Sequence, residues 1–220
     1  MCGRFFFLAS GPAVAGLFQL PDAPDLFPRY NIAPTQPIPA VRAADGGREL
    51  VNLRWGFIPS WSKDGKLAPI NAMSETAPDK PMFRSAFRKR RCLIPADGFY
   101  EWKATPGVKR KQPYAIRLAD DGPLAFAGLW ETWDGPDGPV ESCCILTTAP
   151  NDLTATIHNR MPVILDPRDF GQWLDPKEQD AAALAPMMRP FPAERMRAYR
   201  VSTWVNDVRR HDGRCIEPAA

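Results

Sequence analysis

The chain has 220 residues and a net charge of +3, with 45% hydrophobic and 24% charged residues. This composition is typical of a globular protein with a buried core, and it excludes intrinsically disordered and collagen-like chains. The charge excess is too small to indicate a nucleic-acid partner by itself, and no apolar run reaches the roughly eighteen residues of a membrane span.

The cysteines and histidines argue against disulfide and metal chemistry. Five cysteines are present and no secretion signal precedes them, so we expect free thiols in a soluble cytoplasmic protein. No C-x-x-C spacing occurs and only two histidines are available, so we expect no metal site and no cofactor. The residues concerned are Cys2, Cys92, Cys143, Cys144, Cys215, His158 and His211.

Short elements are expected throughout, because 25 prolines interrupt the sequence. In the first part of the chain, the hydrophobic pattern predicts a strand over 2–9 and a helix over 11–20. Strands over 37–44 and 49–58 are separated by the turn sequence DGG and predict a hairpin.

A basic and aromatic segment follows at KPMFRSAFRKRRC. On a helix, Phe83 and Phe87 lie one turn apart, and so do Arg84 and Arg88, with Arg91 close to the second pair. The segment therefore predicts an apolar face backed by a cationic one. Such a face either binds nucleic acid or is simply solvated.

The second half of the chain again predicts strands and short helices. Asn151 or Asp152 can cap a short helix that ends near His158. The expected strands cover 92–103, 113–119, 123–133, 141–150 and 162–165, the basic group 109–111 forms a hairpin tip, and helices follow from Pro167 and Lys177. The whole chain, 1–220, is expected to be one α+β domain with an antiparallel barrel-like sheet and short peripheral helices.

Four polar or aromatic positions are candidate functional residues. Glu101 interrupts the aromatic strand GFYEW, where a buried carboxylate needs a partner or a function, although an exposed position on a half-buried strand also explains it. His158 is either a catalyst or a structural histidine, and Asn71 either a site residue or a turn former. Trp61 fits a core position or a platform on which a base stacks.

The N-terminal sequence MCGRF offers a different kind of chemistry. Removal of Met1 would leave Cys2 with a free α-amine and a thiol on adjacent carbons, with ordinary pKa values near ~8 and ~8.5. Such an aminothiol condenses with an aldehyde to a thiazolidine, because the thiol traps the imine that the amine forms. The alternative is that Cys2 is a small hydrophobic residue near a strand start.

Taken together, a series of motifs resembles the SOS-response-associated peptidase (SRAP) family nearly end to end. The motifs are MCGRF, PRYNIAPTQ, RWGFIPSW, INAMSET, CLIPADGFYEWK, KQPYAI, FAGLWE and IHNRMPVIL. The resemblance implies one barrel-like α+β domain that binds single-stranded DNA and joins covalently to abasic sites. The opened sugar of an abasic site carries the aldehyde that the aminothiol of Cys2 requires.

The resemblance also implies roles for the candidate catalytic residues. Cys2 is the nucleophile, exposed when the protein removes Met1. Asn71 holds the N-terminal amine and Glu101 is the general acid and base. His158 assists opening of the sugar ring and reversal of the crosslink. Imine formation needs one proton taken up and one given back, which suits a titratable pair.

The expected DNA contacts form a second group. By resemblance, Arg4 and Arg160 bind phosphate, and Trp61 and Pro34 flank the bases. The basic helix adds Arg84 and Arg88. Phosphate contacts carry no sequence information, which suits a lesion sensor. The expected partner is single-stranded DNA with abasic sites, bound by a monomer that associates with the nucleoid.

One position departs from the family pattern, and two other functions remain open. The family commonly has arginine in N-A-R-x-E-T where this chain has Met73, which puts one phosphate contact in doubt. A thiol peptidase acting on other proteins would use Cys2 with His158. A non-covalent reader of modified or single-stranded DNA would need only the basic helix and Trp61.

Overall fold

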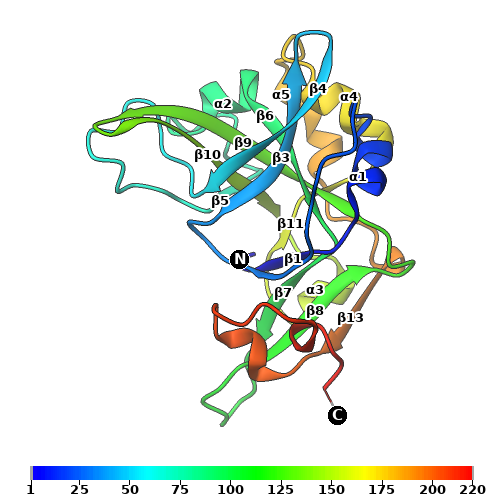
Figure 1. Cartoon of the computed structure of the whole chain (residues 1–220). Coiled ribbons are helices and arrows are strands. Elements are labelled where there is room, and N and C mark those ends of the chain that lie inside the picture. Colours follow the sequence, from blue (N-terminus) through cyan, green and yellow to red (C-terminus); the bar gives the residue numbers. More distant parts are fainter. Residues whose placement is uncertain (1, 220) are drawn as a thin grey trace.

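Two β-sheets carry the fold in the computed structural model, which describes residues 2–219. Figure 1 shows them one above the other, with the N-terminus between them. The upper sheet contains β3 (Pro37–Ala44), β4 (Gly47–Trp55), β5 (Asn71–Met73), β6 (Arg91–Ala96), β9 (Leu124–Gly135), β10 (Gly138–Thr148), β11 (Met161–Pro162) and β12 (Ile164–Leu165). The lower sheet contains β1 (Phe5–Phe7), β2 (Arg29–Ile32), β7 (Gly98–Lys103), β8 (Gln112–Leu118) and β13 (Met196–Arg200).

The upper sheet closes into a barrel. Antiparallel pairs run in the order β10–β9–β6–β3–β4, and a parallel pair between β4 and β10 completes the ring. β5 also pairs with β10 in parallel. The expected barrel-like sheet is therefore confirmed, with parallel pairs at the strand that closes it.

The helices are short and lie outside the sheets, as expected. They are α1 (Gly11–Phe18), α2 (Arg84–Lys89), α3 (Asp152–Ala155), α4 (Phe170–Leu174) and α5 (Ala181–Leu184). Single 3-10 turns add Pro167–Asp169, Ala185–Met188, Ala193–Arg195, Thr203–Asn206 and Gly213–Cys215. Within residues 2–219, no helix has the length and apolar character that crossing a bilayer requires.

The continuous strand expected over 92–103 is in fact two strands in different sheets. The chain leaves the barrel at the end of β6 and enters the lower sheet with β7. Asp97 sits at this break, where its Oδ2 accepts hydrogen bonds from the backbone N–H groups of Leu8 (2.5 Å) and Ala9 (2.9 Å). The carboxylate thus ties the crossing point to the segment that follows β1.

An aromatic cluster joins the two sheets beside the N-terminus. Phe5 on β1 packs edge-on against Trp55 of β4 and Phe126 of β9, with ring centroids 5.2 and 5.8 Å apart. All three side chains are fully buried. Edge-to-face pairs at these distances are favourable beyond the area they bury. The packing fixes the start of β1, and hence the residues that precede it, against the barrel.

The basic segment forms a shorter helix than the sequence indicates, and Arg91 is not part of its cationic face. Phe83 and Phe87 are buried while Arg84 and Arg88 are exposed, as the amphipathic pattern predicts. Arg91 instead starts β6 and is buried. Its guanidinium donates to the carbonyl oxygens of Phe87 (2.6 Å) and Arg88 (3.0 Å), where it satisfies the last turn of α2.

Candidate active site at the N-terminus

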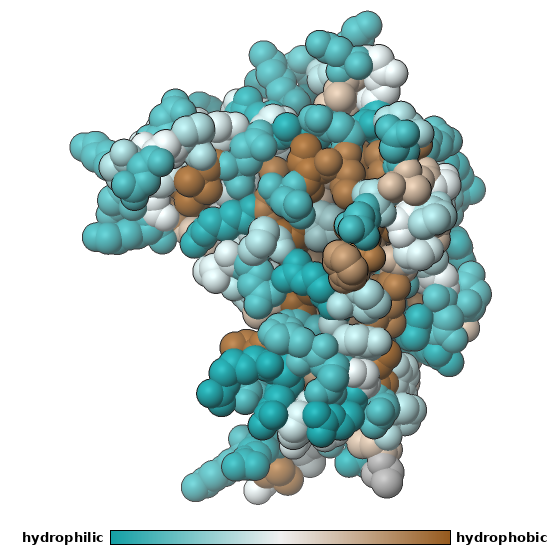
Figure 2. Space-filling view, in the orientation of Figure 1, coloured by the Kyte–Doolittle hydropathy of each residue, from teal (hydrophilic) through white to brown (hydrophobic). Residues whose placement is uncertain are grey.

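Cys2 lies three residues before the start of β1, at the level where the two sheets meet, and its side chain is fully buried. Figure 1 places the N-terminus on the concave side of the molecule. Figure 2 shows the surface hollowed at this level, with mainly hydrophilic side chains along both edges of the hollow. We call this hollow the notch. Cys2 itself is fully buried, so its thiol lies beneath the surface and is not exposed in the notch.

Asn71 fixes the backbone of Cys2. It opens β5, which β10 positions through the parallel pair between Asn71 and Ile145. The side-chain Nδ2 of Asn71 donates a hydrogen bond of 2.9 Å to the carbonyl oxygen of Cys2. The amide therefore holds the first residues of the chain, although its contact is to the Cys2 carbonyl.

Glu101 and His158 lie close together, Glu101 on a strand of the lower sheet and His158 in the loop between α3 and β11. Glu101 lies on β7 and is 4% exposed, so the position is buried as its aromatic neighbours suggest. His158 follows α3, whose N-terminus is capped by reciprocal hydrogen bonds between Asn151 and Thr154. The Nδ1 atom of His158 lies 4.0 Å from Oε1 of Glu101 and accepts from the backbone N–H of Arg160 at 3.1 Å.

The pKa of the Cys2 thiol depends on its burial and on the neighbouring carboxylate. Burial, and in second place the nearby charge of Glu101, raise the pKa of the Cys2 thiol well above its usual range. The thiol is therefore protonated at neutral pH. Any reaction through sulfur requires a base close by or a change in burial.

The two arginines expected to bind phosphate are both engaged within the protein. Arg4 donates from Nη1 to Oδ1 of Asn31 (2.8 Å) and to the carbonyl oxygen of Val205 (3.0 Å). Arg160 donates from Nη1 and Nη2 to the two carboxylate oxygens of Glu75, at 2.6 and 2.8 Å. A phosphate that binds either guanidinium must share it with these partners.

The remaining predicted contact residues are divided between two places. Trp61, between β4 and β5, is 61% exposed, and Pro34 is half-buried after β2. Met73 is 42% exposed and lies on the same face of β5 as Asn71, because alternate residues of a strand share a face. Arg84 and Arg88 lie elsewhere, since Figure 1 shows α2 at the upper end of the molecule, away from the N-terminus.

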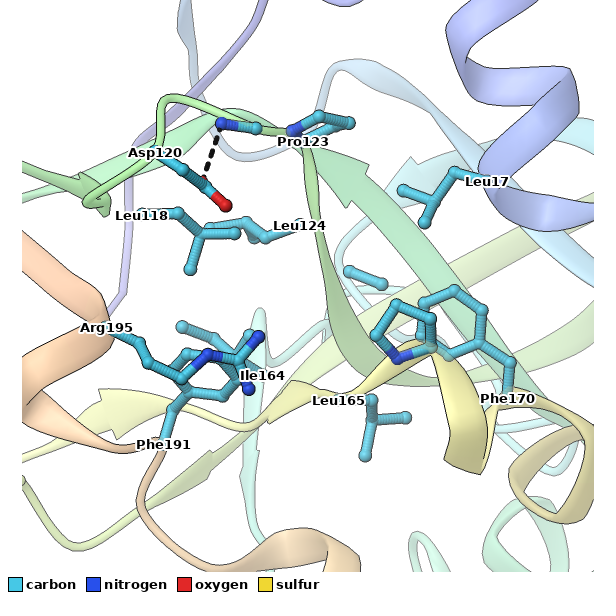
Figure 3. A pocket seen from close by; sticks show the side chains of 13 residues that line it. Leu17, Leu118, Asp120, Pro123, Leu124, Ile164, Leu165, Phe170, Phe191 and Arg195 are labelled. Carbon is cyan, nitrogen blue, oxygen red and sulfur yellow. Dashed lines mark hydrogen bonds between the residues drawn. The ribbon is translucent and has the colours of Figure 1, made fainter.

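The apolar cavity in Figure 3 is separate from this site. It has a volume of about 250 Å³ and contains none of the candidate residues. Leu17 of α1, Phe170 of α4 and Ile164 of β12 contribute to its lining, while Asp120 at one side accepts a hydrogen bond from the backbone of Gly122. The cavity lies where helices pack on the barrel, and the notch remains the candidate site.

Sequence reasoning missed the partners of Arg160. Besides Glu75, the Nη2 atom donates to the carbonyl oxygen of Thr147 at 2.6 Å. Glu75 belongs to the motif INAMSET, but it stands 85 residues before Arg160, so no local pattern links the two. Within residues 2–219, no group of three or more His, Cys, Asp and Glu side chains is arranged to hold a metal ion.

Other proteins resemble this chain in sequence and in fold. "Abasic site processing protein YoqW" of Bacillus subtilis (strain 168) is 42% identical over 224 residues, which cover 99% of each chain. "Abasic site processing protein HMCES" of Gallus gallus is 31% identical over 226 residues, covering 87% of this chain and 66% of that one. A crystal structure of a protein from Bacteroides thetaiotaomicron superposes with a TM-score of 0.84 at 27% identity, covering 98% of this chain and 100% of the other.

The family itself follows from the sequence as a whole. The family described as "SOS response associated peptidase (SRAP)" matches residues 1–208. The match includes the four positions Cys2, Asn71, Glu101 and His158, which the fold brings together. The chain belongs to the SOS response associated peptidase family.

Proposed function

We propose that this protein processes abasic sites by binding single-stranded DNA in the notch and forming a covalent crosslink through Cys2. The observation that carries the proposal is the meeting of four residues from distant parts of the chain. Asn71 bonds the Cys2 carbonyl, the charge of Glu101 acts on the Cys2 thiol, and His158 lies 4.0 Å from Glu101. The curated relatives carry the name of abasic site processing proteins, which agrees with this chemistry.

The reaction joins the aminothiol to the aldehyde of the opened sugar. The α-amine of Cys2 attacks the aldehyde carbon to give a carbinolamine, which loses water to form an imine. The thiol then adds to the imine carbon, and its proton passes to the nitrogen, closing a thiazolidine ring. One water leaves overall and no oxidant is needed.

Glu101 and His158 are proposed to move the protons in these steps. The amine must lose a proton as it attacks, and the departing hydroxyl must gain one. Glu101 is buried beside Cys2, where its carboxylate can take the first proton and return it. His158 is half-buried at the side of Glu101 and is placed to assist opening of the sugar ring.

Removal of Met1 is the required first step, because an acylated amine cannot form an imine. We propose that the site carries out this cleavage itself, in line with the peptidase activity for which the family is described. Asn71 fixes the Cys2 carbonyl beside the bond to be cut, and the Cys2 thiol is the adjacent nucleophile. Intact mass of the purified protein tests this step: a species that retains Met1 and still crosslinks would refute it.

A denaturing gel tests the proposed function as a whole. The protein is mixed with a single-stranded oligonucleotide carrying one abasic site, and the expected result is a band that runs as a stable protein–DNA adduct. An oligonucleotide with a tetrahydrofuran at the same position lacks the aldehyde and should give no adduct. Digestion of casein without an adduct would support a peptidase acting on other proteins, and binding without an adduct would support a non-covalent reader.

A further inference from the structure

The ion pair between Arg160 and Glu75 lies beside the site, with Arg160 two residues after His158. Its geometry is bidentate, with Nη1 to Oε1 at 2.6 Å and Nη2 to Oε2 at 2.8 Å. The Arg160 side chain is 16% exposed and the Glu75 side chain 45%. The arginine is therefore largely enclosed, while its carboxylate partner borders solvent.

Only one edge of the Arg160 guanidinium is open to a ligand. The Nε atom is buried, so an anion arriving from solvent can reach only the edge formed by Nη1 and Nη2. Glu75 already occupies that edge. A carboxylate and a phosphodiester present two oxygens to guanidinium in the same forked arrangement. The two anions therefore compete for one position.

Arg160 does not depend on Glu75 to stay in place. Its Nη2 atom also donates to the carbonyl oxygen of Thr147 on β10, at 2.6 Å. That carbonyl belongs to the barrel and accepts a second bond, from the backbone N–H of Ser74 at 2.9 Å. Glu75 lies in the turn that follows β5, from which its side chain can move into solvent. Arg160 is thus a cation held in place by the barrel, and Glu75 is an anion that can leave it.

The acidity of Glu75 agrees with this reading. Its hydrogen bonds with Arg160 hold the pKa of the Glu75 carboxyl below its usual range. The carboxylate is therefore ionised at neutral pH and competes with phosphate as a full negative charge.

We propose that Glu75 is an internal phosphate mimic that masks Arg160 in the free protein and is displaced when a DNA phosphate binds there. The inference rests on the proposed function, because it takes the phosphate from single-stranded DNA. Glu75 thus sets the affinity for DNA without touching the reacting atoms.

Salt dependence distinguishes displacement from simple attraction. A phosphate that binds an uncovered arginine releases its condensed counterions, which steepens the log–log salt dependence by about 0.7 for a single strand. When Glu75 is displaced, its charge returns to solvent and takes up a cation, which offsets this release. Glu75→Gln removes the offset and leaves an amide that binds guanidinium more weakly.

The test is the affinity for a short, fluorescently labelled single strand carrying a tetrahydrofuran abasic analogue, measured from low to moderate salt. The analogue has no aldehyde, so binding is measured without crosslinking. For Glu75→Gln we expect affinity at low salt to rise about three- to tenfold and the salt slope to steepen by about 0.7. Thermal melting of the variant confirms that it is folded.

Two controls make the result specific to Arg160. Asp121→Asn removes the same charge from the β8–β9 turn, where Asp121 pairs with Arg117 and Arg197, and should leave affinity unchanged. Asn also tolerates the positive φ of 61° at that position. In an Arg160→Gln background, Glu75→Gln should give no gain, because the effect acts through the lost guanidinium.

Three results would overturn the inference. Weaker binding by Glu75→Gln would show that Glu75 positions Arg160, and unchanged binding would show that no phosphate reaches this edge. An equal gain with and without Arg160 would reduce the effect to bulk charge. A parent protein that fails to bind DNA at all would refute the proposed function together with this inference, whereas the first three results leave the proposed function intact.

Discussion

Cys2 combines two properties that rarely occur in one residue, a fully buried thiol and a position next to the chain start. The thiol has a raised pKa from burial and from Glu101, so it is not a reactive thiolate in the described state. We infer that the amine begins the reaction with the aldehyde and that the sulfur acts second. The two functional groups can then be separated by mutation.

Cys2→Ala is expected to leave DNA binding nearly unchanged while abolishing the stable adduct. The variant cannot use the thiol to remove Met1, so Met1 is first removed with a methionine aminopeptidase and its loss is checked by intact mass. The variant then has the α-amine but no thiol, so an imine forms but the ring cannot close. Phosphate contacts, not the thiol, supply the affinity. Borohydride should therefore rescue an adduct by reducing the imine. Equal loss of binding and adduct would instead mean that Cys2 is structural.

Glu101→Gln should slow crosslinking by about 10²-fold, because the amide keeps the shape of the side chain but cannot transfer protons. The rate is measured at saturating DNA, so that any change in affinity does not contribute. The melting temperature should stay close to that of the parent. A rate equal to the parent's would assign Glu101 a purely structural role on β7.

Met73→Arg tests whether the departure from the family pattern weakens DNA binding. Met73 is exposed and shares the Asn71 face of β5, so an arginine there can meet a DNA phosphate. We expect binding tighter by about 1 kcal/mol and a salt slope steeper by about 0.7, with unchanged crosslinking at saturation. An identical slope would show that Met73 does not mark a lost phosphate contact.

At the scale of elements, the sequence predicts those strands that pair with a neighbour close by in the chain. The hairpin expected over 37–44 and 49–58 appears as β3 and β4, with β4 at 47–55, because its two runs are adjacent in the chain and a turn sequence joins them. The break at Asp97 was missed although Pro95, Asp97 and Gly98 are residues that favour turns. What the local sequence does not show is that the two halves join different sheets and that Asp97 bonds to Leu8 and Ala9.

The strands β2 and β13 were missed for a related reason. β2 (Arg29–Ile32) lies in a proline-rich segment, and β13 (Met196–Arg200) follows several short turns, so neither has a periodic pattern of useful length. Both are strands because they pair with β1 and β8. Candidate site residues were predictable where a motif carried them, as for Glu101, and not where the role depends on a distant partner, as for Glu75.

Asp97→Ala should destabilise the protein by about 2–4 kcal/mol, because it leaves the backbone N–H groups of Leu8 and Ala9 without their acceptor. Denaturant unfolding measures the change. Asp97→Asn retains one acceptor oxygen and should cost less. Equal losses for the two variants would show that the carboxylate charge, and not the acceptor, is what matters.

The pH dependence of stability adds a second readout for Asp97. Burial raises the pKa of Asp97 above its ordinary value of 3.8 in the folded protein. The folded state therefore keeps this proton to a higher pH than the unfolded chain does. The contribution of Asp97 to the free energy of unfolding falls as pH rises through that window. Asp97→Asn does not titrate and should lack this part of the pH dependence.

At the scale of the whole molecule, the candidate site draws its residues from both sheets and from a loop. β6 belongs to the barrel and β7 to the lower sheet, so Glu101 comes from the lower sheet, whereas Asn71 comes from the barrel strand β5 and His158 from the loop after α3. The site is thus assembled from both sheets. A substitution that weakens the packing between the two sheets should therefore lower the crosslinking rate even when the secondary structure of each sheet is retained.

The parallel pair that closes the barrel also has a consequence for the order of folding. Arg54 and Ser142 meet in this pair although they are far apart in the chain, so closing it costs more chain entropy than forming the β3–β4 hairpin. We expect closure to be late. Until then, the thiols of Cys92, Cys143 and Cys144, all fully buried in the native protein, remain accessible.

Pulsed alkylation during refolding, followed by mass spectrometry of each cysteine peptide, measures that step directly. The three barrel cysteines should lose their reactivity toward the alkylating reagent together. This loss should follow the appearance of β-structure that circular dichroism detects. Protection of these thiols in the earliest phase would mean that the barrel closes first and that the hairpins form within it. The loss of reactivity of these buried cysteines therefore reports the time at which the barrel closes.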